Sequence, residues 1–336
     1  MPSRPDPKEI EAVLLGGEAR YTRDEAVRLS GASPEFAARV WRALGFAARG
    51  DEAPAFTDSD VEALRITAGL LSSGLLDDDA AVRLARAMGQ TMTRLAEWQT
   101  SILSTLSYAP EEEPDEKDLG SLVGLAGKLL PDVEKLLVHI WRRQLAASAS
   151  RSLAVLGQKE DVSPNYFPLV VGFADLVSFT TLSRELDEVG LADVVEGFEA
   201  TSADIVASSG GRVVKTLGDE ILYVTDTPGQ AAEIALQLAD GVKTHVEVPD
   251  VRVGIAYGPV LAVLGDVFGT TVNRASRLTS FARPGTVLVD DALAALLKDE
   301  SAYQVVAVRA RHAHGLGQLQ PYALRRSFEA SAPQRG

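Results

Sequence analysis

The hydrophobic pattern of the chain changes near residue 160, and this change limits the folds that it can adopt. Before it, apolar residues recur every three or four positions, as in Leu95, Trp98 and Ile102, which is the period of an amphipathic helix. After it, short β-branched runs such as RVVKTL and EILYVT alternate with helical stretches and turn residues. The pattern predicts an all-α region followed by a region that mixes helices and strands.

The boundary between the two regions is expected after a long helix that runs from about Asp132 through SRSLAVL. Gly157 is a plausible C-terminal cap, and Pro164 prevents the helix from resuming. We therefore predict a helical domain over residues 1–158 and a second domain over 159–336. The charge run EEEPDEKD, Glu111 to Asp118, is predicted to be a solvated loop between two helical groups, with an acidic docking site as the alternative.

Composition excludes several classes of protein. A length of 336 residues suits roughly two domains. The 33 basic and 47 acidic residues give a net charge of −14, which repels a phosphate backbone unless a local basic patch exists. The chain has no cysteine, so disulfides and thiolate metal sites are excluded. No targeting segment and no run of about 20 apolar residues is visible, so the cytoplasm is the expected location and no transmembrane segment is expected.

The segment YTRDEAVRLSGASPEFAARVWRALGF and the following FTDSDVEALRITAGLLSSG resemble the helix-turn-helix opening of MerR-type regulators. If this region bound DNA, Arg39, Arg42 and Arg49 would contact phosphate. Residues 1–150 hold 17 basic and 24 acidic residues, a net charge of −7, which favours a helical fold reused for protein contacts. No nucleic-acid partner is therefore expected.

Two carboxylates in the second half are candidates for a metal site. Asp175 follows the apolar strand run VVGFA, where a helix cap or turn residue is the simpler interpretation. Asp219 lies at the glycine turn of the hairpin RVVKTLGDEILYV. If these strands are neighbours, the two carboxylates lie side by side and repel each other, and a hard divalent cation relieves the repulsion. Such a pair suits two-metal chemistry at phosphorus.

A third feature lies in GDVFGTTVNRASRLTSFARPGT. Asn273 and Arg277 are spaced i, i+4 and so share one face of a helix. An amide and a guanidinium that project together can hold a polyphosphate and its developing charge. A surface helix with solvated polar groups is the alternative for this segment taken alone.

The three motifs FADLVSFT, KTLGDE and DVFGTTVNRASR occur in this order, and together they resemble the catalytic domain of class III nucleotidyl cyclases. The resemblance runs from about Tyr166 to about Ser327, and the tail HGLGQLQPYALRR resembles the closing β-hairpin of the family. It implies an α+β, ferredoxin-like βαββαβ fold. The short GPVLAVLGDVFG segment resembles the short-armed bacterial subgroup.

The resemblance also implies roles for individual residues. Asp175 and Asp219 fall on the two metal-binding aspartates, with two Mg²⁺ or Mn²⁺ ions in each active site. Lys215 and Asp266 fall on the adenine-recognising pair, because Lys can donate to adenine N1 and Asp can accept from its N6 amine. Asn273 falls on the asparagine that orients the ribose, and Arg277 on the arginine that stabilises the transition state. The full set implied by the resemblance is Asp175, Asp219, Lys215, Asp266, Asn273 and Arg277.

The implied reaction is that of an adenylate cyclase, a phosphorus–oxygen lyase. The ATP ribose 3′-oxygen attacks the α-phosphorus and pyrophosphate leaves, which gives 3′,5′-cyclic AMP. In this family the site forms across a head-to-tail homodimer, so two equivalent sites are expected. One chain supplies the metal aspartates, and the other supplies the base-binding, ribose and transition-state residues.

The arrangement of the two halves resembles actinobacterial adenylyl cyclases with an N-terminal helical, autoinhibitory, pH-sensing domain. Few side chains of this chain titrate near neutral pH. His139, in the long helix, and His312 and His314, near the end of the chain, are therefore the regulatory candidates, with histidines of no switching role as the alternative. The apolar stripe of the helical half is most simply core or dimer surface, and a lipid or other small-molecule effector there is left open.

Two other functions remain open. A cyclase-like domain can act as a passive sensor or binding module coupled to the MerR-like partner- or DNA-binding domain, although such a domain has no need of all six site residues. Diguanylate cyclases share a related fold, but the turn LGDEIL lacks their paired glycines and phenylalanine.

Overall fold

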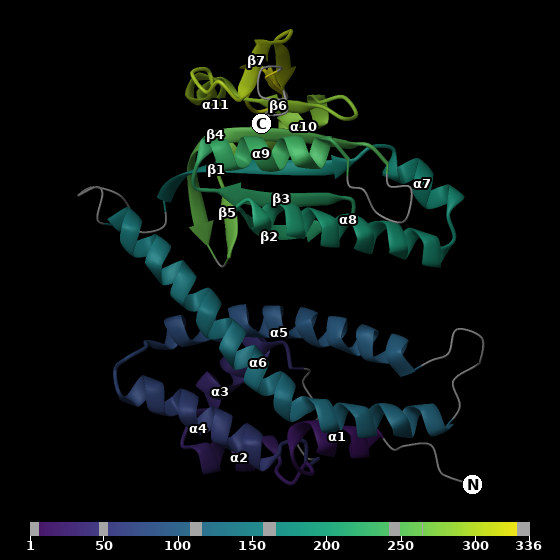
Figure 1. The fold of residues 1–336 in the computed structure, drawn as a ribbon. Helices are drawn as coiled ribbons and strands as arrows, with labels where there is room; N and C mark the ends of the chain where they lie inside the picture. The colour runs from purple at the N-terminus through teal and green to yellow at the C-terminus, as the bar shows by residue number, and fades with distance from the viewer. Residues whose placement is uncertain are drawn as a thin grey trace, which may run out of the picture. The chain divides into compact units, whose positions relative to one another are not determined.

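The computed structural model describes residues 7–46, 53–107, 116–156, 166–241, 249–263 and 265–327. The chain divides into two compact units, Met1–Ser148 and Ala149–Gly336, and the division falls inside helix α6, Glu116–Leu156 (Figure 1). The predicted boundary between residues 158 and 159 lies outside the described residues, together with Gly157 and Pro164. The described helices include no apolar stretch of the kind that spans a bilayer.

The first unit is helical, as predicted, and we call it the helical unit. Its elements before α6 are α1 (Pro7–Leu15), α2 (Arg23–Ser30), α3 (Pro34–Leu44), α4 (Asp58–Ser72) and α5 (Asp78–Ser107). Capping boxes start two of these helices: the side chains of Thr22 and Thr57 accept hydrogen bonds from the backbone N–H three residues later. Small apolar clusters around Trp41 and Phe36 hold the helices together.

Helix α6 (Glu116–Leu156) differs from its predicted extent. We expected a loop through Asp118 and a helix from about Asp132, but the helix already begins at Glu116 and continues past Pro131. A proline inside a helix removes one backbone hydrogen bond and favours a kink, yet it does not end a helix whose flanking residues are strong helix formers. The rest of the predicted loop, together with Arg49 of the first unit, lies outside the described residues.

The second unit, which we call the sheet unit, is built on a mixed β-sheet. The strands are β1 (Tyr166–Leu176), β2 (Arg212–Leu217), β3 (Glu220–Thr225), β4 (Val251–Val263), β5 (Asp266–Phe268), β6 (Val287–Val289), β7 (Tyr303–Ala307) and β10 (Tyr322–Arg326). The order across the sheet is β2-β3-β1-β4-β6-β10-β7, and β5 pairs with β4.

The first four strands give the expected ferredoxin-like order. Helices α7 (Phe179–Glu185) and α8 (Glu188–Ser208) connect β1 to β2, and α9 (Pro228–Ala239) connects β3 to β4. With β2 and β3 joined as a hairpin, the chain runs βαββαβ and the strands lie in the order β2-β3-β1-β4. The fold class predicted from the sequence is confirmed.

Both faces of this sheet are covered. Val170 and Ala174 of β1 pack in a cluster with α8, α9 and α11 (Asp291–Leu297), whereas the intervening Val171 and Phe173 pack with α10 (Thr270–Phe281). Since neighbouring side chains of a strand point to opposite faces, α10 lies across the sheet from the other helices. Helix α10 comes very close to β4 at Gly254. A Cβ at this position would lie 2.1 Å from the backbone N of Thr279, so only glycine allows the close approach.

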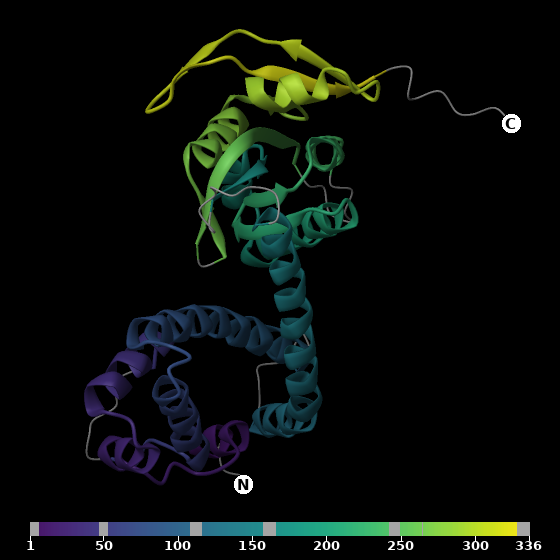
Figure 2. The ribbon, with the colours of Figure 1, turned by 90° about the vertical axis from the view of Figure 1, so that its left-hand side faces the viewer.

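The last strands extend beyond the main sheet. Strands β8 (Arg311–Ala313) and β9 (Gly317–Leu319) form a separate two-stranded hairpin between β7 and β10. Figure 2 shows these yellow strands as a narrow, curved ribbon that runs past α11. The tail that was expected to form one closing hairpin thus contributes β9 to this ribbon and β10 to the main sheet.

Candidate active site

The two candidate metal aspartates lie at the same end of the sheet. Asp175 is near the end of β1, where its register partner on β3 is Glu220. Asp219 is in the β2–β3 turn, which Gly218 enters with a φ of +70°, and its backbone carbonyl accepts a hydrogen bond of 2.9 Å from the N–H of Leu176. The hairpin and strand neighbourhood predicted from the sequence are therefore present.

Negative charge accumulates at this end of the sheet. Burial raises the pKa of Asp175, and the nearby Asp219 carboxylate raises it further. The pKa of Glu220 is raised to about 7, first by burial and then by repulsion from Asp175 and Asp219. A divalent cation would relieve this repulsion, so the donor set fits a metal.

The described residues contain no cluster of three or more His, Cys, Asp or Glu side chains arranged to enclose a metal ion. A site with two protein carboxylates leaves other coordination positions to water or substrate phosphates, which is how Mg²⁺ is commonly held.

Arg252 was not predicted for this site. Its Nε lies 2.6 Å from Oδ2 of Asp175, and a terminal nitrogen of the same guanidinium contacts that oxygen as well. This guanidinium offsets part of the repulsion expected between the two carboxylates. Arg252 stands opposite Asp175 in the β1–β4 register, a pairing between residues 77 positions apart that local sequence patterns do not reveal.

Lys215 and Asp266 form an ion pair. The Nζ of Lys215 on β2 lies 2.6 Å from Oδ2 of Asp266 on β5, although the residues are 51 positions apart. Both side chains keep roughly a third of their surface exposed, at 33% and 27%. The pair therefore presents a donor and an acceptor together at a surface that a ligand can reach.

Asn273 and Arg277 lie on the exposed face of α10. Arg274, between them, turns inward to Asp290, with 2.6 Å between its Nη1 and a carboxylate oxygen. Asp290 also accepts hydrogen bonds from the backbone N–H groups of Tyr257 and Leu293. This buried carboxylate therefore ties α10 to the sheet and holds the exposed face in place.

Within the described ranges, no hydrogen bond or ion pair links Lys215 or Asp266 to Asp175 or Asp219. The side chains of Asn273 and Arg277 also make no such contact there. The described residues thus present two groups: the carboxylates of Asp175, Asp219 and Glu220 with Arg252, and the Lys215–Asp266 ion pair.

The histidine candidates are all exposed. His139 lies on α6, His312 is in β8, and His314 begins the turn after it. Their regulatory role stays a prediction.

Comparison with known proteins identifies the family of this chain. Residues 162–326 match the family described as the Adenylate and Guanylate cyclase catalytic domain. An adenylate cyclase of Streptomyces coelicolor is 50% identical over 300 residues, which span 87% of this chain and 77% of that protein. The chain belongs to the adenylate and guanylate cyclase family.

Two further relatives in this family extend the similarity into the helical unit. An adenylate cyclase of Streptomyces griseus is 47% identical over 288 residues, which span 85% of this chain and 70% of that protein. A pH-sensitive adenylate cyclase of Mycobacterium tuberculosis is 28% identical over 291 residues, which span 85% of this chain and 72% of that protein. Cyclases of this family bind a nucleotide substrate, often dimerise and generally use divalent metal ions.

Proposed function

We propose that this chain is an adenylate cyclase that converts ATP to 3′,5′-cyclic AMP and pyrophosphate. The Lys215–Asp266 pair is the observation that carries the choice of ATP. The ammonium can donate to adenine N1 and the carboxylate can accept from the N6 amine. Guanine offers a donor at N1 and an acceptor at O6, so GTP would leave both side chains wrongly paired. The names of the Streptomyces relatives support the same substrate.

Asp175 and Asp219 would hold the metal, which we propose to be two Mg²⁺ or Mn²⁺ ions per site. Bound metal would supply neutralisation of the triphosphate and a lower pKa for the ribose 3′-hydroxyl. Arg252 pairs with Asp175, so it would share its hydrogen bonds with a substrate phosphate bound at these carboxylates.

The proposed reaction forms a bond between the ribose 3′-oxygen and the α-phosphorus and breaks the bond from that phosphorus to the pyrophosphate oxygen. The 3′-hydroxyl loses its proton, which leaves to solvent together with the released pyrophosphate. Arg277 would stabilise the charge that develops on the α-phosphate, and Asn273 would orient the ribose. Both side chains are exposed on a helix that Asp290 anchors, so they can approach a ligand without first breaking another contact.

The active site is proposed to form between two copies of the chain. The carboxylates with Arg252 and the Lys215–Asp266 pair make no polar contact with each other among the described residues, so each copy would complete the other. A two-fold homodimer of this kind holds two equivalent sites. ATP is a cytoplasmic metabolite, which supports the cytoplasm as the compartment.

The substrate proposal is tested by measuring cyclic nucleotide formation from ATP and from GTP by the full chain. The wild type should use ATP strongly in preference to GTP. Lys215→Gln should lower kcat/KM for ATP by about a hundredfold, because Asp266 and the adenine ring lose their shared partner. Lys298→Gln, an exposed lysine of the sheet unit, is the matched control and should have no effect. Equal use of GTP by the wild type would contradict the proposal.

The dimer proposal is tested by mixing two inactive variants, Asp175→Ala and Arg277→Ala. A mixed dimer holds one site that carries both substitutions and one site that carries neither. Random mixing should therefore restore about a quarter of the wild-type activity. If each chain held a complete site of its own, mixing would restore nothing.

We further propose that the helical unit inhibits the sheet unit and that acidic pH relieves the inhibition. The pH-sensitive mycobacterial relative supports this. Activity should be compared between the full chain and residues 149–336 from about pH 5.5 to about pH 8, the range in which histidine titrates. Only the full chain should become more active at acidic pH, and His139→Gln should flatten its profile of activity against pH. The variants His312→Gln and His314→Gln test the other two candidates in the same way. Identical profiles for both chains would contradict this regulation.

A further inference from the structure

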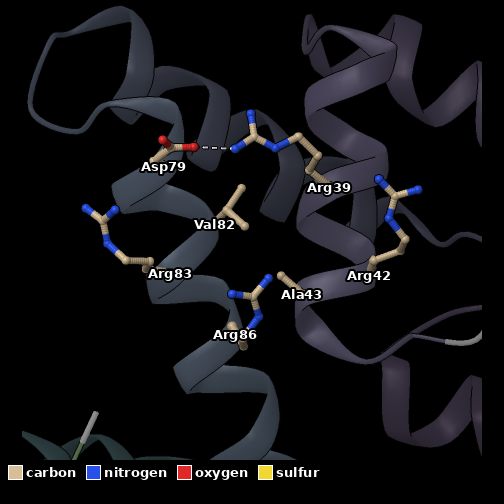
Figure 3. A pocket seen from close by; sticks show the side chains of 7 residues that line it. All are labelled: Arg39, Arg42, Ala43, Asp79, Val82, Arg83 and Arg86. Atoms are coloured by element: carbon tan, nitrogen blue, oxygen red, sulfur yellow. Dashed lines mark hydrogen bonds and ion pairs between the residues drawn. The ribbon is translucent and has the colours of Figure 1, made fainter. Parts of the chain in front are cut away.

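A pocket of about 490 Å³ lies between helices α3 and α5 of the helical unit. Beneath it, Val40 of α3 and Ala85 of α5 belong to one buried apolar cluster, so both walls are held by packing. Seven residues line the pocket, and four of them are arginines. The complete lining is Arg39, Arg42, Ala43, Asp79, Val82, Arg83 and Arg86. Figure 3 shows Arg39 and Arg86 between the two helices, with Arg42 and Arg83 on either side.

The pocket carries more positive charge than its acidic residues neutralise. Arg39 is paired: its Nη2 lies 2.5 Å from Asp79 and its Nη1 lies 3.6 Å from Asp78. The guanidinium groups of Arg42, Arg83 and Arg86 make no hydrogen bond or ion pair with any residue in the described parts of the chain. The pocket lining thus holds four guanidinium groups and one carboxylate, Asp79, with Asp78 as a further partner of Arg39, in a chain whose net charge is −14.

The spacing of these arginines adds to the repulsion. Arg39 and Arg42 stand three positions apart on α3, and Arg83 and Arg86 stand three positions apart on α5. Like charges at this spacing on a helix repel each other. A cluster of unpaired cations on two packed helices is therefore stabilised by any anion that fits between them.

We propose that this pocket binds a compact anion with two or more phosphate-type charges. Guanidinium groups bind phosphate through paired N–H···O bonds, and arginines from two helices can hold such a group from both sides. The volume lies within the range of small-ligand pockets, about 300–1,000 Å³. The same chemistry is offered by a free pyrophosphate or nucleotide and by a phospholipid headgroup.

The geometry favours a small ligand over duplex DNA. Arg39 of α3 is held by acidic residues of α5, and Arg86 lies in the space between the helices rather than on a free helix face (Figure 3). A duplex would also bring its phosphates close to Asp78 and Asp79, which repel them.

The test is isothermal titration of the full chain with inorganic pyrophosphate in EDTA. We expect binding by the wild type and a loss of at least about tenfold in affinity for Arg42→Gln/Arg86→Gln, which removes one charged partner from each helix. Arg94→Gln, an exposed arginine farther along α5, is the matched control and should bind normally. Arg277→Gln should also bind normally at the pocket, which separates this site from the active site.

Pyrophosphate binding that is lost in Arg277→Gln but kept in Arg42→Gln/Arg86→Gln overturns the proposal. Co-sedimentation with phosphatidylglycerol vesicles, with phosphatidylcholine vesicles as control, identifies the source: lipid binding that needs Arg42 and Arg86 supports a headgroup ligand. Binding to a DNA duplex that is stronger than binding to pyrophosphate and that needs Arg42 and Arg86 overturns the proposal in favour of nucleic acid.

The double variant also needs a control for folding. Its two replaced side chains are exposed, and unchanged thermal unfolding would show that any loss of binding is not a loss of fold. The proposal does not depend on cyclase activity, so it can fail separately from the proposed function.

Discussion

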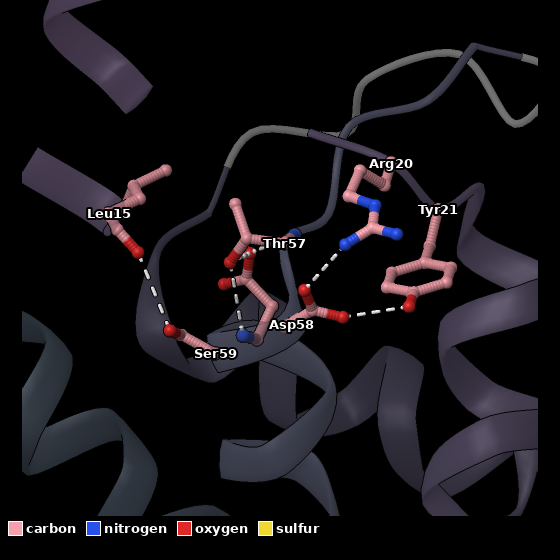
Figure 4. A network of polar contacts seen from close by, with 7 residues as sticks. Leu15, Arg20, Tyr21, Thr57, Asp58 and Ser59 are labelled. Atoms are coloured by element: carbon pink, nitrogen blue, oxygen red, sulfur yellow. Dashed lines mark hydrogen bonds and ion pairs between the residues drawn. The ribbon is translucent and has the colours of Figure 1, made fainter. Parts of the chain in front are cut away.

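The helical unit and the sheet unit handle charge in different ways. In the sheet unit, carboxylates are taken into the fold: the side chain of Asp290 is 3% exposed and that of Asp175 is 12% exposed, each against an arginine. In the helical unit the described ion pairs stand in solvent. Asp58 accepts hydrogen bonds from the Arg20 guanidinium and the Tyr21 hydroxyl (Figure 4). The side chains of Arg20 and Asp58 are 63% and 67% exposed.

The energetic consequence of this difference is large. A buried pair is costly to break, because the remaining partner becomes an unpaired buried charge, whereas an exposed pair contributes little. The sheet unit therefore fixes its charged groups in one arrangement, as catalysis requires. The helical unit keeps the charged groups of its described ion pairs in solvent.

The largest effect is expected at Asp175. Asp175→Asn should lower cyclic AMP formation by about a thousandfold, because a charged group at the reacting phosphate is lost. Mn²⁺ should raise the thermal unfolding temperature of the wild type and not that of the variant. Asp193→Asn, an exposed position on α8, is the control and should keep both properties. Full activity of Asp175→Asn would remove this residue from the metal site.

The next largest effect is expected in stability, when the buried Arg274–Asp290 pair is broken. Arg274→Met leaves Asp290 unpaired and should lower the free energy of unfolding by about 3–5 kcal/mol, measured by urea denaturation. Arg326→Met removes the partner of Glu233, a pair that is 41% and 35% exposed, and should cost far less. Equal losses in the two variants would show that burial does not set the difference.

Glu220 provides a test by pH. The pKa of Glu220 is about 7 in the folded chain, and its ordinary value in an unfolded chain is 4.5. Between these two pH values the folded chain keeps a proton on Glu220 that the unfolded chain releases. Stability should therefore fall as pH rises from about 4.5 to about 7. In metal-free buffer, Glu220→Gln should be relatively more stable than the wild type above this window, and the difference should shrink toward pH 4.5. A difference independent of pH would contradict the assignment.

The smallest effect is expected in the helical unit. Arg20→Gln should change the free energy of unfolding by no more than about 1 kcal/mol, and added salt should reduce the change further. Urea denaturation at low and high salt measures both. A loss as large as that of Arg274→Met would break the contrast between the two units.

Sequence patterns predicted the features that depend on neighbours along the chain. The glycine turn that carries Asp219, the shared helix face of Asn273 and Arg277, and the alternation of strands and helices are all local, and all are present. The start of α6 was missed, because the charge run and Pro131 favour a break locally while the helix formers around them sustain the helix.

What the sequence by itself determined is the family, the fold class and the chemical types of the site residues. Only the tertiary structure decided that Arg252 neutralises Asp175, that Glu220 joins the carboxylates, and that arginines of α3 and α5 line one pocket. These contacts join residues far apart in the chain, and they depend on strand register and helix packing. Hydrophobic periodicity shows which face of an element is buried, but not which distant side chain lies opposite it.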